Sequence, residues 1–140
     1  MPSWRRQKIV SKRPIVQPLG DLETALMDIV WQHPTVTARE VCDRMTGARE
    51  RAYTTVMTTL DRLHRKGLLE RRKDGIAWRY EARSTKREYE RALADQLATK
   101  ILAEHGDTAL SAFVDAADKV DRDLLDKLER LIEVRRKARR

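Results

Sequence analysis

Residues 51–82 read RAYTTVMTTLDRLHRKGLLERRKDGIAWRYEA, and they predict a helix followed by a β-hairpin. The helix is predicted from Arg51 to Lys66, because apolar residues recur there at spacings of three and four and share one face. That face consists of Ala52, Val56, Leu60 and Leu63. Gly67 is a typical helix-ending residue, and Asp74-Gly75 between two strand-forming runs is a strong hairpin signal.

Two further helices are predicted before this stretch. The first has apolar residues at helical spacing, namely Leu19, Leu22, Leu26, Ile29 and Val30. It ends near Trp31, because Pro34 cannot continue a helix. Thr37 and Glu40 have the spacing of a capping box, which begins the second helix. Three helices followed by a hairpin is the order of a winged helix-turn-helix domain, which we predict over residues 19–83.

Residues 84–140 are predicted to be a helical dimerisation region. Thr85 and Glu88 cap a long helix, Gly106 breaks it, and Asp121 can cap a last helix. The apolar stripes of these helices can be covered by a second copy about a twofold axis, or by folding back on the winged helix of the same chain. The predicted dimer interface comprises Leu97, Ile101, Phe113, Leu124, Leu128, Leu131 and Ile132. The fold class is therefore mostly α with a small β-hairpin wing.

The charge of the chain is unevenly distributed. The 140 residues carry a net charge of +8, and residues 1–83 hold 17 Lys and Arg against 10 Asp and Glu. Residues 84–134 hold 8 against 12, and residues 135–140 carry five cations. A basic front half indicates a polyanionic partner. Residues 1–18 are predicted to be a flexible basic arm that adds phosphate contacts.

The outward face of the third predicted helix suits contacts with DNA. Threonine is a poor helix former, but its hydroxyl can reach bases and phosphates in the major groove. A basic wing would meet the phosphate backbone, while Trp78 and Tyr80 are predicted to pack. The DNA-binding candidates are Thr37, Arg39, Arg51, Tyr53, Thr54, Thr55, Thr58, Arg62, Arg65, Arg72, Lys73 and Arg79. The alternatives are a solvated helix face, or a protein-interaction module whose basic face docks an acidic partner.

The sequence predicts no enzyme, metal site or cofactor. His33, His64 and His105 are far apart and lack metal-ligand spacing, and no glycine-rich phosphate loop is present. The one cysteine, Cys42, cannot form an internal disulfide, which fits a cytoplasmic protein. No apolar run approaches the roughly 20 residues that a membrane-spanning helix needs, so no membrane insertion is expected.

Taken together, these segments resemble the penicillinase repressor family (BlaI/MecI/CopY) over roughly residues 19–134. The segments that carry the resemblance are LGDLE at 19–23 with Trp31, TAREV at 37–41, AYTTVMTTLDRL at 52–63, KGL at 66–68 and WRY at 78–80. The resemblance implies a homodimeric repressor that binds a palindromic operator through an N-terminal winged helix. It further implies dimerisation through C-terminal helices and, in many members, control of β-lactam resistance genes.

The resemblance also implies roles for individual residues. The positions that match family DNA contacts are Thr54, Thr55 and Thr58, and Arg62 matches a backbone contact. In the β-lactam-responsive members, a membrane metalloprotease sensor cleaves the repressor in a region that corresponds to Ala112-Phe113. Those members carry Asn where this chain has Ala112. The copper-responsive members carry a C-terminal Cys-x-Cys motif, which this chain lacks.

Overall fold

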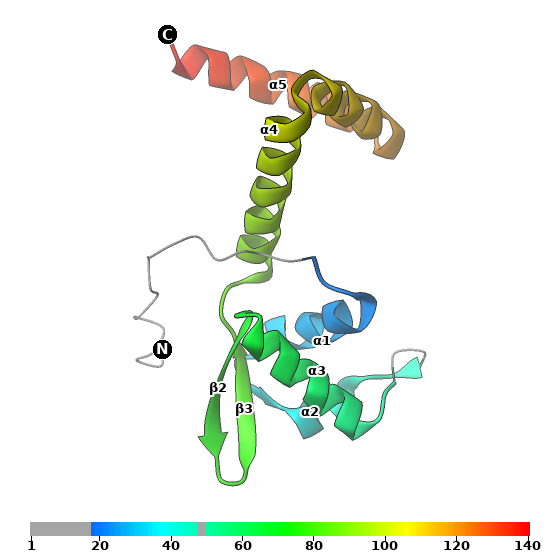
Figure 1. Ribbon diagram of the computed structural model, residues 1–140, viewed down its shortest axis with the longest axis vertical. Helices are drawn as coiled ribbons and strands as arrows, with labels where there is room; N and C mark the ends of the chain where they lie inside the picture. Colours follow the sequence, from blue (N-terminus) through cyan, green and yellow to red (C-terminus); the bar gives the residue numbers. More distant parts are fainter. Residues whose placement is uncertain (1–17, 48–49) are drawn as a thin grey trace. The chain divides into compact units, whose positions relative to one another are not determined.

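The computed structural model describes residues 18–47 and 50–140, so the predicted basic arm lies outside the described residues except for Pro18. The elements are α1 (Asp21–Trp31), β1 (Val36–Thr37), α2 (Ala38–Arg44), α3 (Tyr53–Arg65), β2 (Leu69–Asp74), β3 (Ala77–Ala82), α4 (Lys86–Val120) and α5 (Asp123–Ala138) (Figure 1). This order confirms the predicted fold class. The chain divides into two compact units, one ending at Ala94 and one running from Asp95 to Arg140.

The starts of the first two helices are held by side-chain caps. At α1 the Gly20 N–H donates to Glu23 Oε1 at 3.3 Å, so a carboxylate in the first turn accepts one of the backbone N–H groups that have no partner within the helix. At α2 the predicted capping box is confirmed. The Glu40 N–H donates to Thr37 Oγ1 and the Thr37 N–H donates to Glu40 Oε2, both at 3.2 Å.

The small sheet has the strand order β1-β3-β2, and β3 pairs antiparallel with both neighbours. Asp74 pairs with Ala77, so the two residues of the turn are Gly75 and Ile76, one position beyond the predicted Asp74-Gly75. Gly75 has a φ of 65°, a left-handed conformation that glycine adopts without steric cost. In Figure 1 the β2–β3 hairpin projects beyond the helices, as a wing does.

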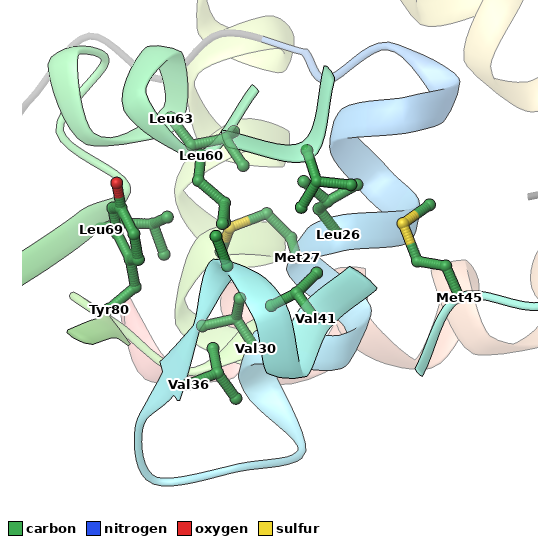
Figure 2. Close-up of a cluster of buried hydrophobic side chains, with 12 residues drawn as sticks. Leu26, Met27, Val30, Val36, Val41, Met45, Leu60, Leu63, Leu69 and Tyr80 are labelled. Carbon is green, nitrogen blue, oxygen red and sulfur yellow. The ribbon is translucent and has the colours of Figure 1, made fainter. Parts of the chain in front are cut away.

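The core of the first unit lies between α1, α2, α3 and the sheet (Figure 2). Its members are Leu26, Met27, Val30, Val36, Ala38, Val41, Met45, Val56, Leu60, Leu63, Leu69 and Tyr80. Each large side chain in such a core contributes about 1.5–3 kcal/mol by leaving water. Ala52 was predicted on the apolar face of the third helix but is exposed, because it is the N-cap residue before α3. The core therefore fixes one face of α3 and leaves the opposite face in solvent.

The first turns of α4 pack against α1 within the first unit. Trp31 Nε1 donates to the Ser84 carbonyl at 3.0 Å, and the ring centroids of Trp31 and Tyr89 are 5.6 Å apart. Lys86 Nζ lies 3.0 Å from Asp28 Oδ1. These turns therefore belong with the winged helix, although the helical region predicted from the sequence begins at residue 84.

The unit from Asp95 to Arg140 has almost no core of its own. The backbone is non-helical at Gly106, where two helices meet at a kink within α4, so the predicted break is confirmed. Asp121 Oδ1 accepts the Asp123 N–H at 3.0 Å, but the N-cap residue of α5 is Arg122, one position later than predicted. No residue of α5 is buried. The exposed large apolar side chains of this unit are Leu97, Ile101, Leu102, Leu110, Phe113, Val114, Val120, Leu131, Ile132 and Val134.

Candidate nucleic-acid interface

Helix α3 presents a polar face to solvent. Val56, Leu60 and Leu63 on its inner side are 0% exposed, whereas the side chains of the outer face are accessible. Exposed positions that were predicted to contact DNA are Tyr53, Thr54, Thr55, Thr58, Arg62 and Arg65. Because the inner side is locked in the core, the outer face is held rigidly with respect to the rest of the domain, as a recognition helix requires.

The threonines of α3 differ in what they can offer a ligand. The Thr58 hydroxyl donates to the Thr54 carbonyl at 2.9 Å, so its oxygen remains available as an acceptor. An acceptor on this face suits the amino groups that adenine and cytosine present in the major groove. Thr59 is 3% exposed and donates to the Thr55 carbonyl, so it is a packing residue. Among the described residues, the hydroxyls of Thr54 and Thr55 have no hydrogen-bond partner and can donate to a phosphate or a base.

Candidates from α2 and the turn before α3 surround the start of the recognition helix. The Arg39 guanidinium is exposed and lies over the Tyr53 ring, 4.3 Å from its centroid. Thr37 is half-buried and its hydroxyl accepts the Glu40 N–H, so its first role is to cap α2. Arg51 Nη1 donates to the Glu50 carbonyl at 2.8 Å. The structure thus brings Arg39 and Tyr53 together and gives Thr37 and Arg51 backbone partners.

The two predicted cations of β2 and the one of β3 differ in their surroundings. Arg72 and Lys73 are exposed, and Lys73 Nζ lies 4.4 Å from the centroid of the Trp78 ring. Arg79 is half-buried, with Nε 2.8 Å from Asp74 Oδ2 and Nη2 3.5 Å from Glu40 Oε1. The hydrogen bond with Arg79 holds the pKa of Asp74 below its ordinary value. The charge of Arg79 is therefore shared with two carboxylates, and its contact with phosphate stays a prediction.

An acidic residue links the recognition helix to the wing. Asp61 Oδ1 accepts from Arg71 Nη1 on β2 at 2.8 Å, and Asp61 Oδ2 lies 3.0 Å from Arg65 Nε one turn later on α3. His64 adds a second link, since its Nδ1 lies 3.0 Å from the Leu69 carbonyl oxygen. The sequence shows the Asp61–Arg65 spacing, but Arg71 is recognisable only once β2 is placed beside α3. These contacts hold the wing at a defined angle to the helix.

Residues 18–47 and 50–140 contain neither a metal-ion cluster nor a membrane-spanning helix. No group of three or more His, Cys, Asp or Glu side chains lies close enough together there to hold a metal ion. Within the same residues, no helix combines the length and the apolar character needed to cross a lipid bilayer.

The fold and the exposed threonine-rich helix define a winged helix-turn-helix protein that binds DNA. Residues 19–134 match the penicillinase repressor family. The chain is 37% identical over 116 residues to the transcriptional regulator BlaI of Mycobacterium tuberculosis, in strains CDC 1551 / Oshkosh and ATCC 25618 / H37Rv. These alignments cover 81% of this chain and 82% of each relative. The chain therefore belongs to the penicillinase repressor family.

A solved structure is also similar to this chain. It is the solution structure of the DNA-binding domain of the repressor BlaI, with 27% sequence identity and a TM-score of 0.45. The match covers 54% of this chain and 88% of that domain. Family membership confirms the resemblance inferred from the sequence and makes the chain a DNA-binding transcriptional repressor. It does not favour the alternative of a module that docks an acidic protein.

Proposed function

We propose that the protein represses transcription as a homodimer that binds a palindromic operator. The observation that carries this proposal is the outer face of α3, where threonines with available hydroxyl groups lie beside cations that have no ion pair within the described residues. Thr54, Thr55 and Thr58 read base edges in the major groove, and Arg62, Arg72 and Lys73 contact phosphates. This division of roles is typical of helix-turn-helix proteins.

The dimer is supported by the apolar surface of the second unit. Phe113, Leu131 and Ile132 are 40%, 65% and 44% exposed, and exposed apolar side chains gathered in one small unit mark an interaction surface. A second copy buries the same residues on both chains about a twofold axis. The two recognition helices then meet half-sites about 34–36 Å apart, or a multiple of that distance. A palindromic operator is the expected target for that reason.

The dimer is tested by sedimentation of the purified protein at micromolar concentration. A dimer that dissociates when Ile132 is replaced by Asp supports the proposal, because a buried carboxylate without a partner is strongly unfavourable. Asp126→Asn is the matched control, since it changes one charge on the same helix without entering the apolar stripe. A monomeric wild-type protein would contradict the proposed architecture.

DNA binding is tested by electrophoretic mobility shift with the DNA upstream of the protein's own gene. The expected result is a shifted band that survives an excess of unrelated duplex, because the base contacts add to the phosphate contacts. Thr55→Ala is expected to lower this preference while leaving binding to unrelated duplex unchanged. A shift that disappears equally with any competitor would remove the operator from the proposal.

Induction by proteolysis is a further part of the proposal. The family resemblance points to cleavage near Ala112-Phe113, in the cytoplasm, by a metalloprotease sensor that is bound to the membrane. Both residues are exposed on α4. A helical segment must unwind locally before a protease can hold it in extended form. Co-expression with a sensor protease, followed by mass spectrometry of the fragments, tests this step. An intact chain after induction would contradict it.

A further inference from the structure

Several cations around α3 are held by other side chains, in one of two ways. Those with a carboxylate within ion-pair distance are Arg65, Lys66, Arg71, Arg79, Arg83 and Lys86. Arg39 and Lys73 instead lie against aromatic rings, and the described residues provide no carboxylate within that distance of either. Arg39 and Lys73 are also exposed. Arg39 and Lys73 therefore each have a defined position, although no carboxylate compensates their charge.

An aromatic ring and a carboxylate hold a cation in different ways. A carboxylate cancels most of the field that the cation would exert on a nearby phosphate. The face of an aromatic ring attracts the cation through its quadrupole but carries no net charge, so the full positive charge remains available. A side chain already held in place also loses less conformational freedom when it binds. A cation stacked on a ring is therefore expected to bind a phosphate more tightly than a salt-bridged cation, whose charge is compensated. It is also expected to bind more tightly than an unrestrained cation, which loses more conformational freedom on binding.

We propose that Tyr53 and Trp78 are positioning residues that hold Arg39 and Lys73 ready for DNA phosphates. The inference rests on the proposed DNA binding and extends it to two residues that need not touch DNA. Arg39 comes from α2 and Tyr53 from the first turn of α3, so one stack joins the two helices of the helix-turn-helix. Lys73 and Trp78 face each other across the β2–β3 ladder, so the second stack lies on the wing.

Substitution of Tyr53 is easier to interpret than substitution of Trp78, because Tyr53 lies outside the core. Its side chain is 36% exposed and takes no part in the core of the first unit. Trp78 packs against that core and lies under Arg71 as well, at 4.3 Å. Replacement of Tyr53 by Leu removes the aromatic face but keeps apolar bulk, whereas Tyr53→Phe keeps the face and removes only the hydroxyl. A comparison of these two variants therefore distinguishes a stacking role of Tyr53 from a direct hydrogen bond of its hydroxyl to DNA.

The experiment measures Kd of the full chain for a fluorescein-labelled duplex of mixed sequence by anisotropy, between 50 and 200 mM salt. Tyr53→Leu is expected to weaken binding about two- to fivefold, which corresponds to an exposed cation–π contact. The slope of log K against log salt is expected to stay unchanged, because no charge is lost. Tyr53→Phe is expected to bind like the wild type. Arg39→Ala is expected to make the slope shallower by about 0.9.

A double-mutant cycle links the two residues. In the Arg39→Ala background, Tyr53→Leu is expected to have no further effect, because its role is to hold the missing cation. Lys86→Ala is the matched control. Lys86 lies over the Trp31 ring at 6.0 Å but is paired with Asp28, so its loss is expected to leave the slope unchanged.

Three results would overturn the inference while wild-type binding persists. They are equal loss in Tyr53→Phe and Tyr53→Leu, additive losses in the double mutant, or unchanged binding by Tyr53→Leu. The wing is tested separately with Trp78→Leu in the wild-type and Lys73→Ala backgrounds, using variants whose thermal unfolding shows a folded chain. Additive losses there would overturn its half of the inference. If the wild-type protein does not bind the duplex, the proposed function itself is overturned.

Discussion

Replacement of Asp61 by Asn is expected to weaken the fold and strengthen non-specific DNA binding at the same time. The Asp61 carboxylate holds Arg71 of the wing at 2.8 Å and Arg65 of the recognition helix at 3.0 Å. Asn keeps an acceptor oxygen of similar shape but removes the negative charge. The variant therefore loosens the link between α3 and β2 and leaves two guanidinium groups without their counter-charge.

The size of the stability loss follows from the exposure of the partners. Hydrogen bonds to charged groups contribute about 1.5–3 kcal/mol. The side chains of Arg71 and Asp61 are 23% and 33% exposed, so solvent screening reduces this value to about 1 kcal/mol. Arg65 is 79% exposed and adds at most about 0.5 kcal/mol. For a unit of this size, a loss of about 1 kcal/mol lowers Tm by about 4–8 °C.

The gain in DNA binding follows from Coulomb's law. A carboxylate about 7 Å from a phosphate costs about 0.6 kcal/mol in a dielectric like that of water, which is about threefold in affinity. Differential scanning fluorimetry measures Tm, and anisotropy with a mixed-sequence duplex measures Kd. Glu129→Gln on α5 is the control, because it changes the net charge equally at a site outside the winged helix. Weaker duplex binding by Asp61→Asn at an unchanged Tm would refute the reasoning.

Three further outcomes are expected. Thr55→Ala should lose about 1–3 kcal/mol of preference for the operator over unrelated DNA, and an unchanged ratio of the two Kd values would exclude a base contact. Burial raises the pKa of Glu23, but hydrogen bonds from Lys66 and the Gly20 N–H outweigh burial and hold this pKa below its ordinary value of 4.5. The resulting stabilisation is present above about pH 4.5 and is lost as pH falls through the lowered pKa, so Glu23→Gln should flatten the acid limb of Tm against pH. Ile76 is 99% exposed, so Ile76→Ser should leave Tm unchanged, and a lower Tm would show that the turn residue packs.

Local patterns were sufficient to predict the three helices and the hairpin of the winged helix. The Thr37–Glu40 capping box and the apolar face of α3 depend on residues three or four positions apart, which the sequence displays directly. The hairpin turn lies one residue later than predicted. Asp74 still pairs with Ala77 in the β2–β3 ladder, and Gly75 adopts the left-handed conformation. The start of α3 was also displaced, and Ala52 became an exposed cap rather than a core residue.

The sequence alone therefore established the order of the three helices and the hairpin, the inward-facing Val56, Leu60 and Leu63 of α3, and the family, because these follow from short-range spacing and residue type. Only the tertiary structure decided which cations of the DNA-facing side keep their full charge. Arg79 meets Glu40 across 39 positions of the chain and is compensated, whereas Lys73 on the adjacent strand rests on Trp78 and is not. The reason is physical: the field of a side chain depends on neighbours brought together by packing, and residues distant in the chain leave no periodic signal of that meeting.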